Sequence, residues 1–253
     1  MCMDKKIKIL VYTEDVIANA KTMMKATLEN VTVENVQAAY PNGLFEAIAG
    51  AFDERFEVRE AGIDNIRETI TPQILADTDV LFWWGHMRHQ DVPDDIVEMV
   101  VREVQKGMGF VGLHSAHASK PFVRLLGTTG SLSWRHNDRE RVWVTAPYHP
   151  IAQGLPTYFE LEKEEMYGEP FDVPPPEDTV FMGWFAGGEV FRSGLTYRRG
   201  YGKIFYFQPG HEEHPIYYDP TIRHILQNAA LWTAPDVRLD TIKFPHIKNP
   251  IEK

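Results

Sequence analysis

The stretch "GFVGLHSAHASK", residues Gly109–Lys120, joins a strand, a sharp turn and the beginning of a helix. Gly109–Leu113 is apolar enough to form a short buried strand, and a helix is predicted from Ser119 to Leu126. The turn at Gly112–Ala116 has small residues at both ends, as in a nucleophile elbow, where strain lifts the central side chain above the sheet. The central residue here is His114, where acyl-transfer enzymes keep serine or cysteine. We therefore predict a functional histidine at this turn.

The chain before this turn alternates between strands and helices. Strands are predicted at Ile7–Tyr12, Phe56–Glu60 and Asp79–Gly85, and helices at Asn42–Phe52 and Pro93–Lys106. The run "DVLFWWG" is apolar throughout, which is typical of a parallel strand covered on both faces. This alternation favours an α/β fold with a parallel, doubly wound sheet.

The second half of the chain has a different pattern. Strands are predicted at residues 141–146, 179–185, 189–199 and 203–208, separated by glycine and proline turns, and they indicate an antiparallel extension. A helix at Asp219–Trp232 closes the domain. We expect one domain over residues 1–235 and a tail, residues 236–253, packed on its surface. The segment from Glu14 to Ala39 is ambiguous and is expected to be partly helical.

The composition excludes several classes of protein. The chain has 253 residues with 26 basic and 36 acidic side chains, so its formal charge is −10. This excess argues against binding to nucleic acid or anionic membranes. The single cysteine, Cys2, allows neither an internal disulfide nor a thiolate zinc cluster. Without a signal-peptide pattern or a membrane-length apolar run, we expect a cytoplasmic protein, and a homo-oligomer is compatible with the sequence.

Three histidines follow predicted strands: His86, His114 and His211. Ligands bind at the carboxyl ends of the strands in open parallel sheets, so we expect these three side chains to face one pocket. Neutral imidazoles bind zinc or a similar divalent ion, and a single histidine also serves as general acid or base near pH 7. The spacing matches no strong zinc signature, so both uses stay open.

Other side chains are candidates for the same pocket. Glu165 and Tyr167 alternate, so in a strand they would share one side. Trp84 and Tyr167 offer flat apolar surfaces of the kind on which sugar rings stack. Ser115, with His211 and Glu213, has the composition of a serine triad, but it stands one position past the elbow tip. Its alternative roles are to cap the following helix or to donate its backbone N–H to a ligand.

Several motifs together resemble the trehalose utilization protein (ThuA-like) family. They are "DVLFWWGH", "GMGFVGLHSAHA", "HPIAQGLP", "EEMYGEP" and "GYGKIFYFQPGHEEHP", and the resemblance extends from about Ile7 to Trp232. It implies a class I glutamine amidotransferase-like fold with a flavodoxin-like, mostly parallel sheet. It also implies that His114 occupies the place of the nucleophilic cysteine, and that His211 and Glu213 occupy the places of the catalytic His and Glu. Without an elbow cysteine, glutaminase chemistry through a thioester is excluded.

The resemblance also implies a function in carbohydrate catabolism, alongside a dehydrogenase that makes keto-sugars. We expect an enzyme that hydrolyses, isomerises or eliminates a trehalose-related disaccharide or its keto-sugar derivative, with no nucleotide cofactor. The alternative is a non-catalytic carbohydrate-binding or regulatory protein. The expected catalytic residues are His114, His211, Glu165 and Glu213; the expected substrate-binding residues are His86, Ser115, Tyr167 and Trp84; the expected ligands of zinc or another divalent ion are His86, His114 and His211.

Overall fold

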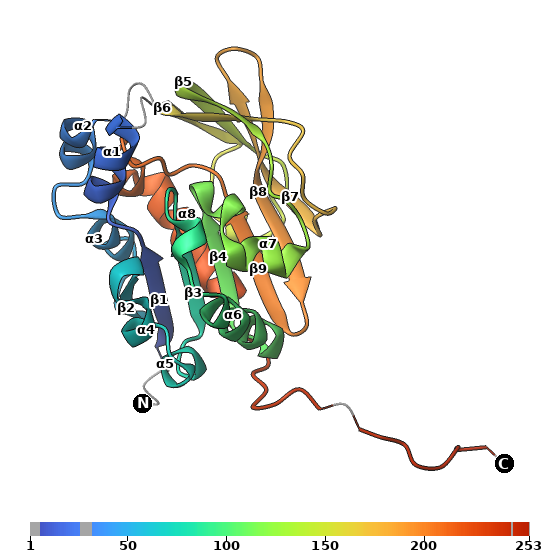
Figure 1. Cartoon of the computed structure of the whole chain (residues 1–253). Helices are drawn as coiled ribbons and strands as arrows, with labels where there is room; N and C mark the ends of the chain where they lie inside the picture. The colour runs from blue at the N-terminus through green and yellow to red at the C-terminus, as the bar shows by residue number, and fades with distance from the viewer. Residues whose placement is uncertain (1–5, 26–31, 244, 253) are drawn as a thin grey trace.

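The computed structural model describes residues 6–25, 32–243 and 245–252, which build a nine-stranded sheet with helices on both faces (Figure 1). The strands are β1 (Ile7–Thr13), β2 (Phe56–Gly62), β3 (Val80–Trp84), β4 (Gly109–Leu113), β5 (Ser133–Val144), β6 (Tyr158–Gly168), β7 (Asp178–Phe185), β8 (Val190–Arg199) and β9 (Gly202–Phe207). They lie in the order β2-β1-β3-β4-β9-β8-β7-β5-β6. The predicted α/β class is confirmed.

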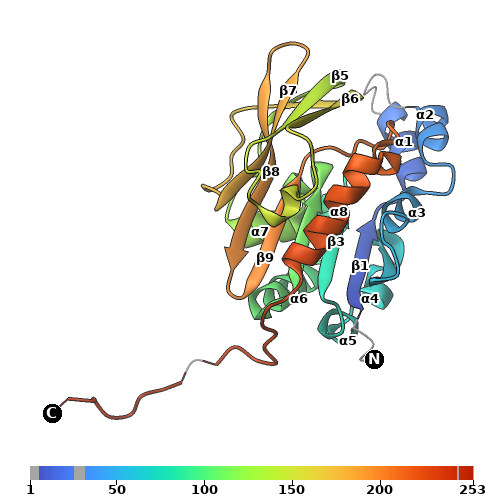
Figure 2. The ribbon, with the colours of Figure 1, turned by 180° about the vertical axis from the view of Figure 1, so that it is seen from behind.

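The helices form two layers. They are α1 (Val16–Lys25), α2 (Val33–Ala39), α3 (Leu44–Ala49), α4 (Ile66–Thr69), α5 (Pro72–Ala76), α6 (Asp94–Lys106), α7 (Lys120–Leu126) and α8 (Pro220–Thr233). Apolar side chains of α1, α2, α3 and α8 share one core with the sheet, and those of α4 to α7 share the other. Figure 2, the view from behind, shows α8 lying across this face of the sheet. Two cores explain why the central strands are apolar throughout.

The parallel half of the sheet positions the site. Strands β2, β1, β3, β4 and β9 pair in parallel, so their carboxyl ends lie at one edge. The side chains of β3 alternate between the two cores: Phe82 and Trp84 face one, and Leu81 and Trp83 face the other. The loops after β3, β4 and β9 therefore converge, as predicted for the three histidines.

The antiparallel half is larger than the sequence predicts. Strands β9, β8, β7, β5 and β6 pair antiparallel, so the sheet is mixed rather than mostly parallel. Strand β5 begins at Ser133, well before the expected Arg141. The segment "SWRHNDRE" is too polar to predict as a strand, but pairing with β6 extends it, with Trp134 opposite Tyr167. This extension carries additional polar residues to the site.

The ambiguous segment and the C-terminal tail, which we expected to pack on the surface, differ in outcome. The region from Glu14 to Ala39 is partly helical, since it holds α1 and α2, and residues 26–31 lie outside the described residues. The C-terminal tail packs on the body only over its first residues. Leu239 donates its backbone N–H to Lys106, and Arg238 bonds to Leu75 and Glu103. The described residues after position 239 are exposed and run away from the body (Figure 1).

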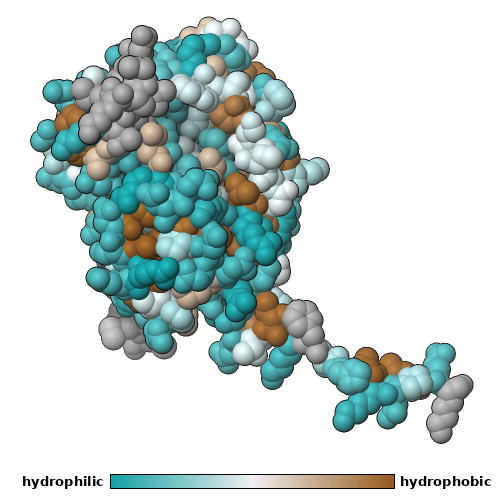
Figure 3. All heavy atoms as spheres, in the orientation of Figure 1, coloured by the Kyte–Doolittle hydropathy of each residue, from teal (hydrophilic) through white to brown (hydrophobic). Residues whose placement is uncertain are grey.

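The surface carries many hydrophilic side chains. The face in Figure 3 is largely hydrophilic, with scattered apolar patches between the charged residues. Among the helices of the described ranges, none has the length and apolar character needed to cross a bilayer.

Candidate active site

The elbow forms as predicted, directly after β4. His114 has a φ of 51°, in the left-handed region that a residue with a Cβ adopts at a cost, and its side chain is fully buried. Its Nδ1 lies 2.9 Å from the carbonyl oxygen of Gln208. Ser119 caps the following helix α7 with its hydroxyl, so the capping role considered for Ser115 belongs to Ser119. The strained turn thus delivers an imidazole into the polar interior at the sheet edge.

A cavity of about 260 Å³ opens beside the elbow. Its walls come from the loop after β3, the elbow, β5 and β6. The lining residues are His86, Met87, His89, Ser115, His117, Ala118, Trp134, His136, Glu165 and Tyr167. The size is near the lower end of ligand pockets, which span about 300–1,000 Å³. The cavity therefore suits a ligand of about one sugar ring, with several imidazoles around it.

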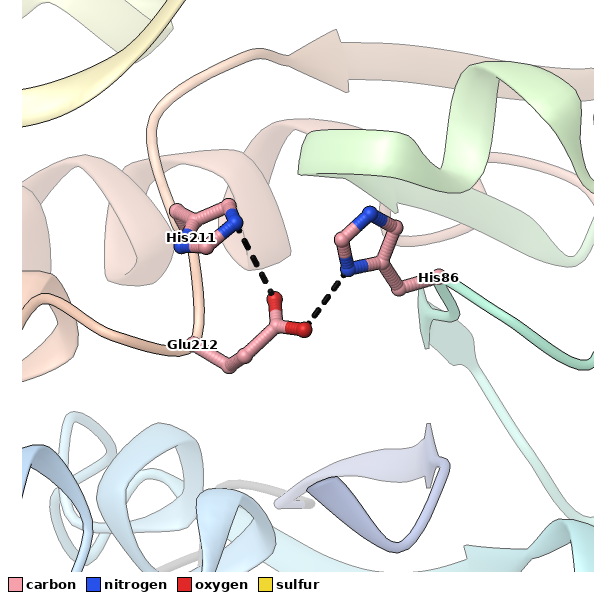
Figure 4. A group of neighbouring side chains, drawn as sticks. All are labelled: His86, His211 and Glu212. Carbon is pink, nitrogen blue, oxygen red and sulfur yellow. Dashed lines mark hydrogen bonds and ion pairs between the residues drawn. The ribbon is translucent and has the colours of Figure 1, made fainter. Parts of the chain in front are cut away.

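Glu212 lies between two of the predicted histidines (Figure 4). Its carboxylate lies 2.7 Å from Nδ1 of His86 and 3.8 Å from Nε2 of His211. Burial alone would lower the pKa of His86, but the Glu212 carboxylate outweighs it and raises that pKa to about 9. Burial opposes ionisation of Glu212, yet the His86 imidazole holds its pKa at about 2. His86 is therefore an imidazolium near neutral pH, with Nδ1–H bound to Glu212.

A second ion pair joins the elbow to the cavity wall. Nε2 of His114 lies 3.2 Å from Glu165 and 3.3 Å from the hydroxyl of Tyr167, whose ring stacks on the imidazole. Nδ1 of His136 lies 3.4 Å from the same Glu165 carboxylate. Burial opposes ionisation of Glu165, but the surrounding histidines His211 and His114 hold its pKa well below the ordinary value. Glu165 is therefore a carboxylate that reaches the cavity, with His114 behind it.

His211 differs from the other two histidines. Its Nδ1 accepts a hydrogen bond from the backbone N–H of Glu213 at 3.2 Å, so the neutral ring carries its hydrogen on Nε2. That Nε2 is buried and has no hydrogen-bond partner among the described residues. Burial lowers the pKa of His211 to about 3, so the ring stays neutral. His211 is thus a neutral donor aimed between the carboxylates of Glu165 and Glu212.

The three predicted histidines lie close together, but two of the three distances between their rings are longer than a single zinc ion would set. The ring centroids of His86, His114 and His211 lie 5.3 to 6.0 Å apart. Three imidazoles around one zinc, at Zn–N distances of about 2.0–2.1 Å, would place their centroids roughly 5–5.5 Å apart. His86 and His114 each hold Nδ1 against an oxygen, which is the usual arrangement of metal-bound histidine, but Nε2 of His114 already contacts Glu165 and Tyr167. His211 departs from this arrangement, because its Nδ1 accepts a hydrogen bond and its hydrogen is on Nε2.

Potential ligand groups are clustered around His211. Three groups each have ligand atoms within 4.8 Å of one another: His86, His211 and Glu212; His114, Glu165 and His211; and His136, His211 and Glu213. Imidazole and carboxylate are ligands that zinc accepts. Of these residues, His86, His136 and Glu165 also line the cavity, so an ion held there would face a ligand in it.

The predicted residues are distributed unevenly around the cavity. His86, Ser115, Glu165 and Tyr167 line it, whereas His114 and His211 lie behind its wall. Ser115 donates its hydroxyl to the carbonyl of Gly85 at 2.8 Å rather than to a histidine, so the serine-triad arrangement is not formed.

Two predicted residues have structural surroundings instead. Trp84 is fully buried in the core and donates its indole N–H to the carbonyl of Gly210, which anchors the loop before His211. Glu213 accepts hydrogen bonds from Thr32 N and Asn35 Nδ2 at the beginning of α2. Neither side chain lines the cavity, so the positions at which we expected substrate contact and catalysis hold the scaffold together.

Sequence reasoning missed several residues of the site. Glu212, rather than its neighbour Glu213, contacts His86, and no periodicity in the loop after β9 distinguishes the two. Glu164 is buried and accepts the backbone N–H groups of Glu165, Gly210 and His211. His117 lies three residues after the elbow tip, a short spacing that could have indicated a second imidazole on the same turn. It lines the cavity together with His89 and His136.

Known proteins with the same fold share little sequence with this chain. A ThuA-like protein from Parabacteroides merdae superposes with a TM-score of 0.62 at 15% identity, covering 94% of this chain and 93% of that one. A ThuA-like protein from Bacteroides uniformis gives 0.59 at 16% identity, covering 92% and 93%. A cytoplasmic protein from Salmonella typhimurium gives 0.55 at 11% identity, covering 76% and 85%. These likenesses establish the fold.

The sequence itself establishes the family. Among curated proteins, none matches the chain. The family model ThuA, described as trehalose utilisation, matches residues 8–233, which is most of the chain. The resemblance inferred from the motifs is thereby confirmed, and the chain belongs to the ThuA (trehalose utilisation) family.

Proposed function

We propose that this protein is an enzyme of carbohydrate catabolism that acts on a trehalose-related disaccharide or its keto-sugar derivative. The observation that carries the proposal is the pairing of opposite charges at one cavity: the His86 imidazolium, held by Glu212, and the Glu165 carboxylate, held by His114. An acid and a base whose pKa values are pushed apart are typical of proton-transfer sites. Family membership supports the sugar as substrate.

The geometry favours isomerisation or elimination over hydrolysis. In a keto-sugar, the carbon next to the carbonyl is acidic enough for a carboxylate to abstract its proton. Glu165 takes that proton, and His86 gives the proton on its cavity-facing Nε2 to the carbonyl oxygen, so charge and protons balance in an enediol. In isomerisation, Glu165 returns its proton to the former carbonyl carbon, and His86 takes the proton of the neighbouring enediol hydroxyl. In elimination, the proton on Glu165 leaves with the glycosidic oxygen as an alcohol, and His86 takes back the enol proton as the carbonyl re-forms. His114 and His136 orient Glu165 for this step.

A divalent ion is compatible with the same residues. His114, Glu165 and His211 would hold it, because their ligand atoms lie within 4.8 Å of one another, with His114 bound through Nε2 after it loses a proton. Bound there, zinc would polarise a sugar oxygen as a Lewis acid. The chain's own contribution is the fixed orientation of the His114 ring by the carbonyl of Gln208.

Aromatic rings give the cavity its sugar-like complementarity. Tyr167 forms part of the wall, and Trp134 lies at the edge of the cavity with a side chain that is 53% exposed. The Trp134 and His136 rings pack edge to face, with their centroids 5.1 Å apart. We infer that the reacting ring enters the cavity and that the second ring of a disaccharide stacks on Trp134.

The test is to incubate the protein with trehalose and with trehalose oxidised to a ketone on one ring, and to follow the products by chromatography. We expect consumption of the keto-sugar by the wild type and loss of turnover in His86→Gln and Glu165→Gln. His224→Gln is the matched control, because His224 bonds to the carbonyl of Gln153 away from the cavity. Sugar binding without turnover in the wild type would instead support the non-catalytic alternative.

A further inference from the structure

A carboxyl group lies fully buried in the sheet, behind the candidate active site. Glu140 of β5 is fully buried, and one of its oxygens, Oε1, lies 3.0 Å from the hydroxyl of Ser193. The other oxygen, Oε2, is buried with no hydrogen-bond partner in the ranges that the structure describes. Within those same ranges Glu140 forms no ion pair. An ionised carboxylate with one donor at most is costly in such surroundings.

The hydroxyl of Ser193 lies between two oxygen atoms. It lies 3.0 Å from Glu140 Oε1 and 3.3 Å from Oε1 of Gln208. The orientation of the Gln208 amide is fixed, because its Nε2 donates to the carbonyl of Glu165 at 3.0 Å and that carbonyl can only accept. Ser193 has a single hydrogen. If Glu140 were ionised, its carboxylate and the Gln208 oxygen would compete for that hydrogen, and one would be left without a donor.

We propose that Glu140 is a neutral carboxylic acid whose proton sets the direction of a hydrogen-bond chain that positions the elbow histidine. Glu140 O–H donates to Ser193 Oγ, Ser193 O–H donates to Gln208 Oε1, and Gln208 Nε2–H donates to the carbonyl of Glu165. In this arrangement each donor hydrogen of Glu140 and Ser193, and Nε2–H of Gln208, has an acceptor. The backbone carbonyl of Gln208 in turn accepts Nδ1–H of His114.

The surroundings of Glu140 are built for this neutral group. A Cβ added to Gly183 on the neighbouring strand β7 would lie 2.3 Å from Glu140 Oε1 and 2.4 Å from Ser193 Oγ. The glycine therefore leaves the space that the carboxyl and hydroxyl groups fill. The titratable groups that face Glu140 are Glu164 of β6 and Tyr206 of β9, so the neighbouring carboxylate disfavours a second negative charge. Burial and Glu164 together raise the pKa of Glu140 well above its ordinary value.

Glu140 is thus a positioning residue, and its role rests on the proposed function of the site. Gln208 contacts both members of the second ion pair, His114 through its carbonyl and Glu165 through its amide. A change of charge at Glu140 would free the Gln208 side chain to rotate, and the orientation of His114 and Glu165 would then no longer be fixed. The protonation state of Glu140 can be measured without any assay of activity. A wrong assignment of that state can therefore be distinguished from a wrong assignment of the reaction.

The experiment compares infrared spectra at pH 8 of the wild type, Glu140→Gln and Glu160→Gln. Glu160 is the matched control, because its exposed carboxylate pairs with Arg139 and Arg141. We expect the wild type to show the carbonyl band of a protonated carboxylic acid, Glu140→Gln to lose it, and Glu160→Gln to keep it. A wild-type spectrum without an acid band that depends on Glu140 would overturn the proposal.

A second readout tests the link to the elbow. Glu140→Gln keeps an N–H donor for Ser193, so the nuclear magnetic resonance signal of His114 Nδ1–H should stay where it is in the wild type. Ser193→Ala removes the middle of the chain and should shift or broaden that signal while the protein stays folded. An unchanged His114 signal in folded Ser193→Ala would contradict the positioning role, and a displaced signal in Glu140→Gln would contradict the direction of the chain.

Discussion

Glu212 holds Nδ1 of His86 at 2.7 Å, and this contact fixes which nitrogen of His86 faces the candidate cavity. A carboxylate that accepts Nδ1–H leaves Nε2 to act on a ligand, as in many catalytic and metal-bound histidines. Burial opposes charge on both side chains, but their mutual attraction keeps the pair charged near neutral pH. The central chemistry of the site therefore depends on a residue next to the one that the sequence pattern favours.

Replacing Glu212 should lower the pKa of His86. In Glu212→Gln we expect the His86 titration to move from about 9 toward or below the ordinary value of about 6.5. Such a shift corresponds to about 3 kcal/mol of interaction between the two groups. The measurement is a nuclear magnetic resonance titration of the His86 ring in both proteins. A His86 signal that titrates identically in wild type and variant would contradict this account.

The same pair predicts how stability depends on pH. The pKa of His86 is raised in the folded state, so its stabilisation is fully present below the unfolded value and is lost as the pH rises through about 9. The free energy of unfolding of the wild type should therefore fall between about pH 6.5 and pH 9, relative to Glu212→Gln. Urea denaturation at a series of pH values checks this. Parallel curves for the two proteins would show that the pair carries no linked proton.

Replacing Trp134 should affect disaccharide binding, whereas replacing Trp84 should affect the stability of the fold. Trp134→Ala should change the free energy of unfolding by about 0.5 kcal/mol or less, because the side chain is exposed, while weakening disaccharide binding. Trp84→Ala should cost about 3–5 kcal/mol, because it empties a fully buried position. Calorimetric titration with trehalose and denaturant unfolding give both quantities. Disaccharide affinity that is unaffected in Trp134→Ala would remove the stacking role.

Much of the fold can be predicted from this sequence because its elements carry local signals. The run Val80–Trp84 is apolar on both sides, and the small residues around His114 indicate the elbow. Strand β5 is not fully predictable, because pairing with β6 rather than its own composition extends it to Ser133. The same limit applies to the site: nothing local distinguishes Glu212 from Glu213, or shows that Trp84 faces the core. Which of two adjacent side chains reaches a cavity depends on the tertiary path of the loop.

Loading with zinc should release protons. His114 donates Nδ1–H and carries a raised pKa, burial notwithstanding, because Glu165 lies beside it. Binding of a metal at Nε2 requires the proton there to leave, so affinity should fall as the pH falls. Calorimetry of the untagged, chelator-treated protein in buffers of different ionisation enthalpy counts the protons. A protein that holds only trace metal, and whose melting temperature ignores added zinc, would leave the metal-free acid–base pair in place.

The most direct test of the central claim is exchange of the substrate's carbon-bound hydrogen with solvent. Keto-trehalose is incubated in deuterium oxide with wild type, His86→Gln, Glu165→Gln and His224→Gln, and deuterium next to the carbonyl is followed by nuclear magnetic resonance. We expect enzyme-dependent incorporation by the wild type and His224→Gln, with the rate reduced about 10²–10⁴-fold in the other two variants. Incorporation no faster than without protein, by a wild type that binds the keto-sugar, would contradict the claim.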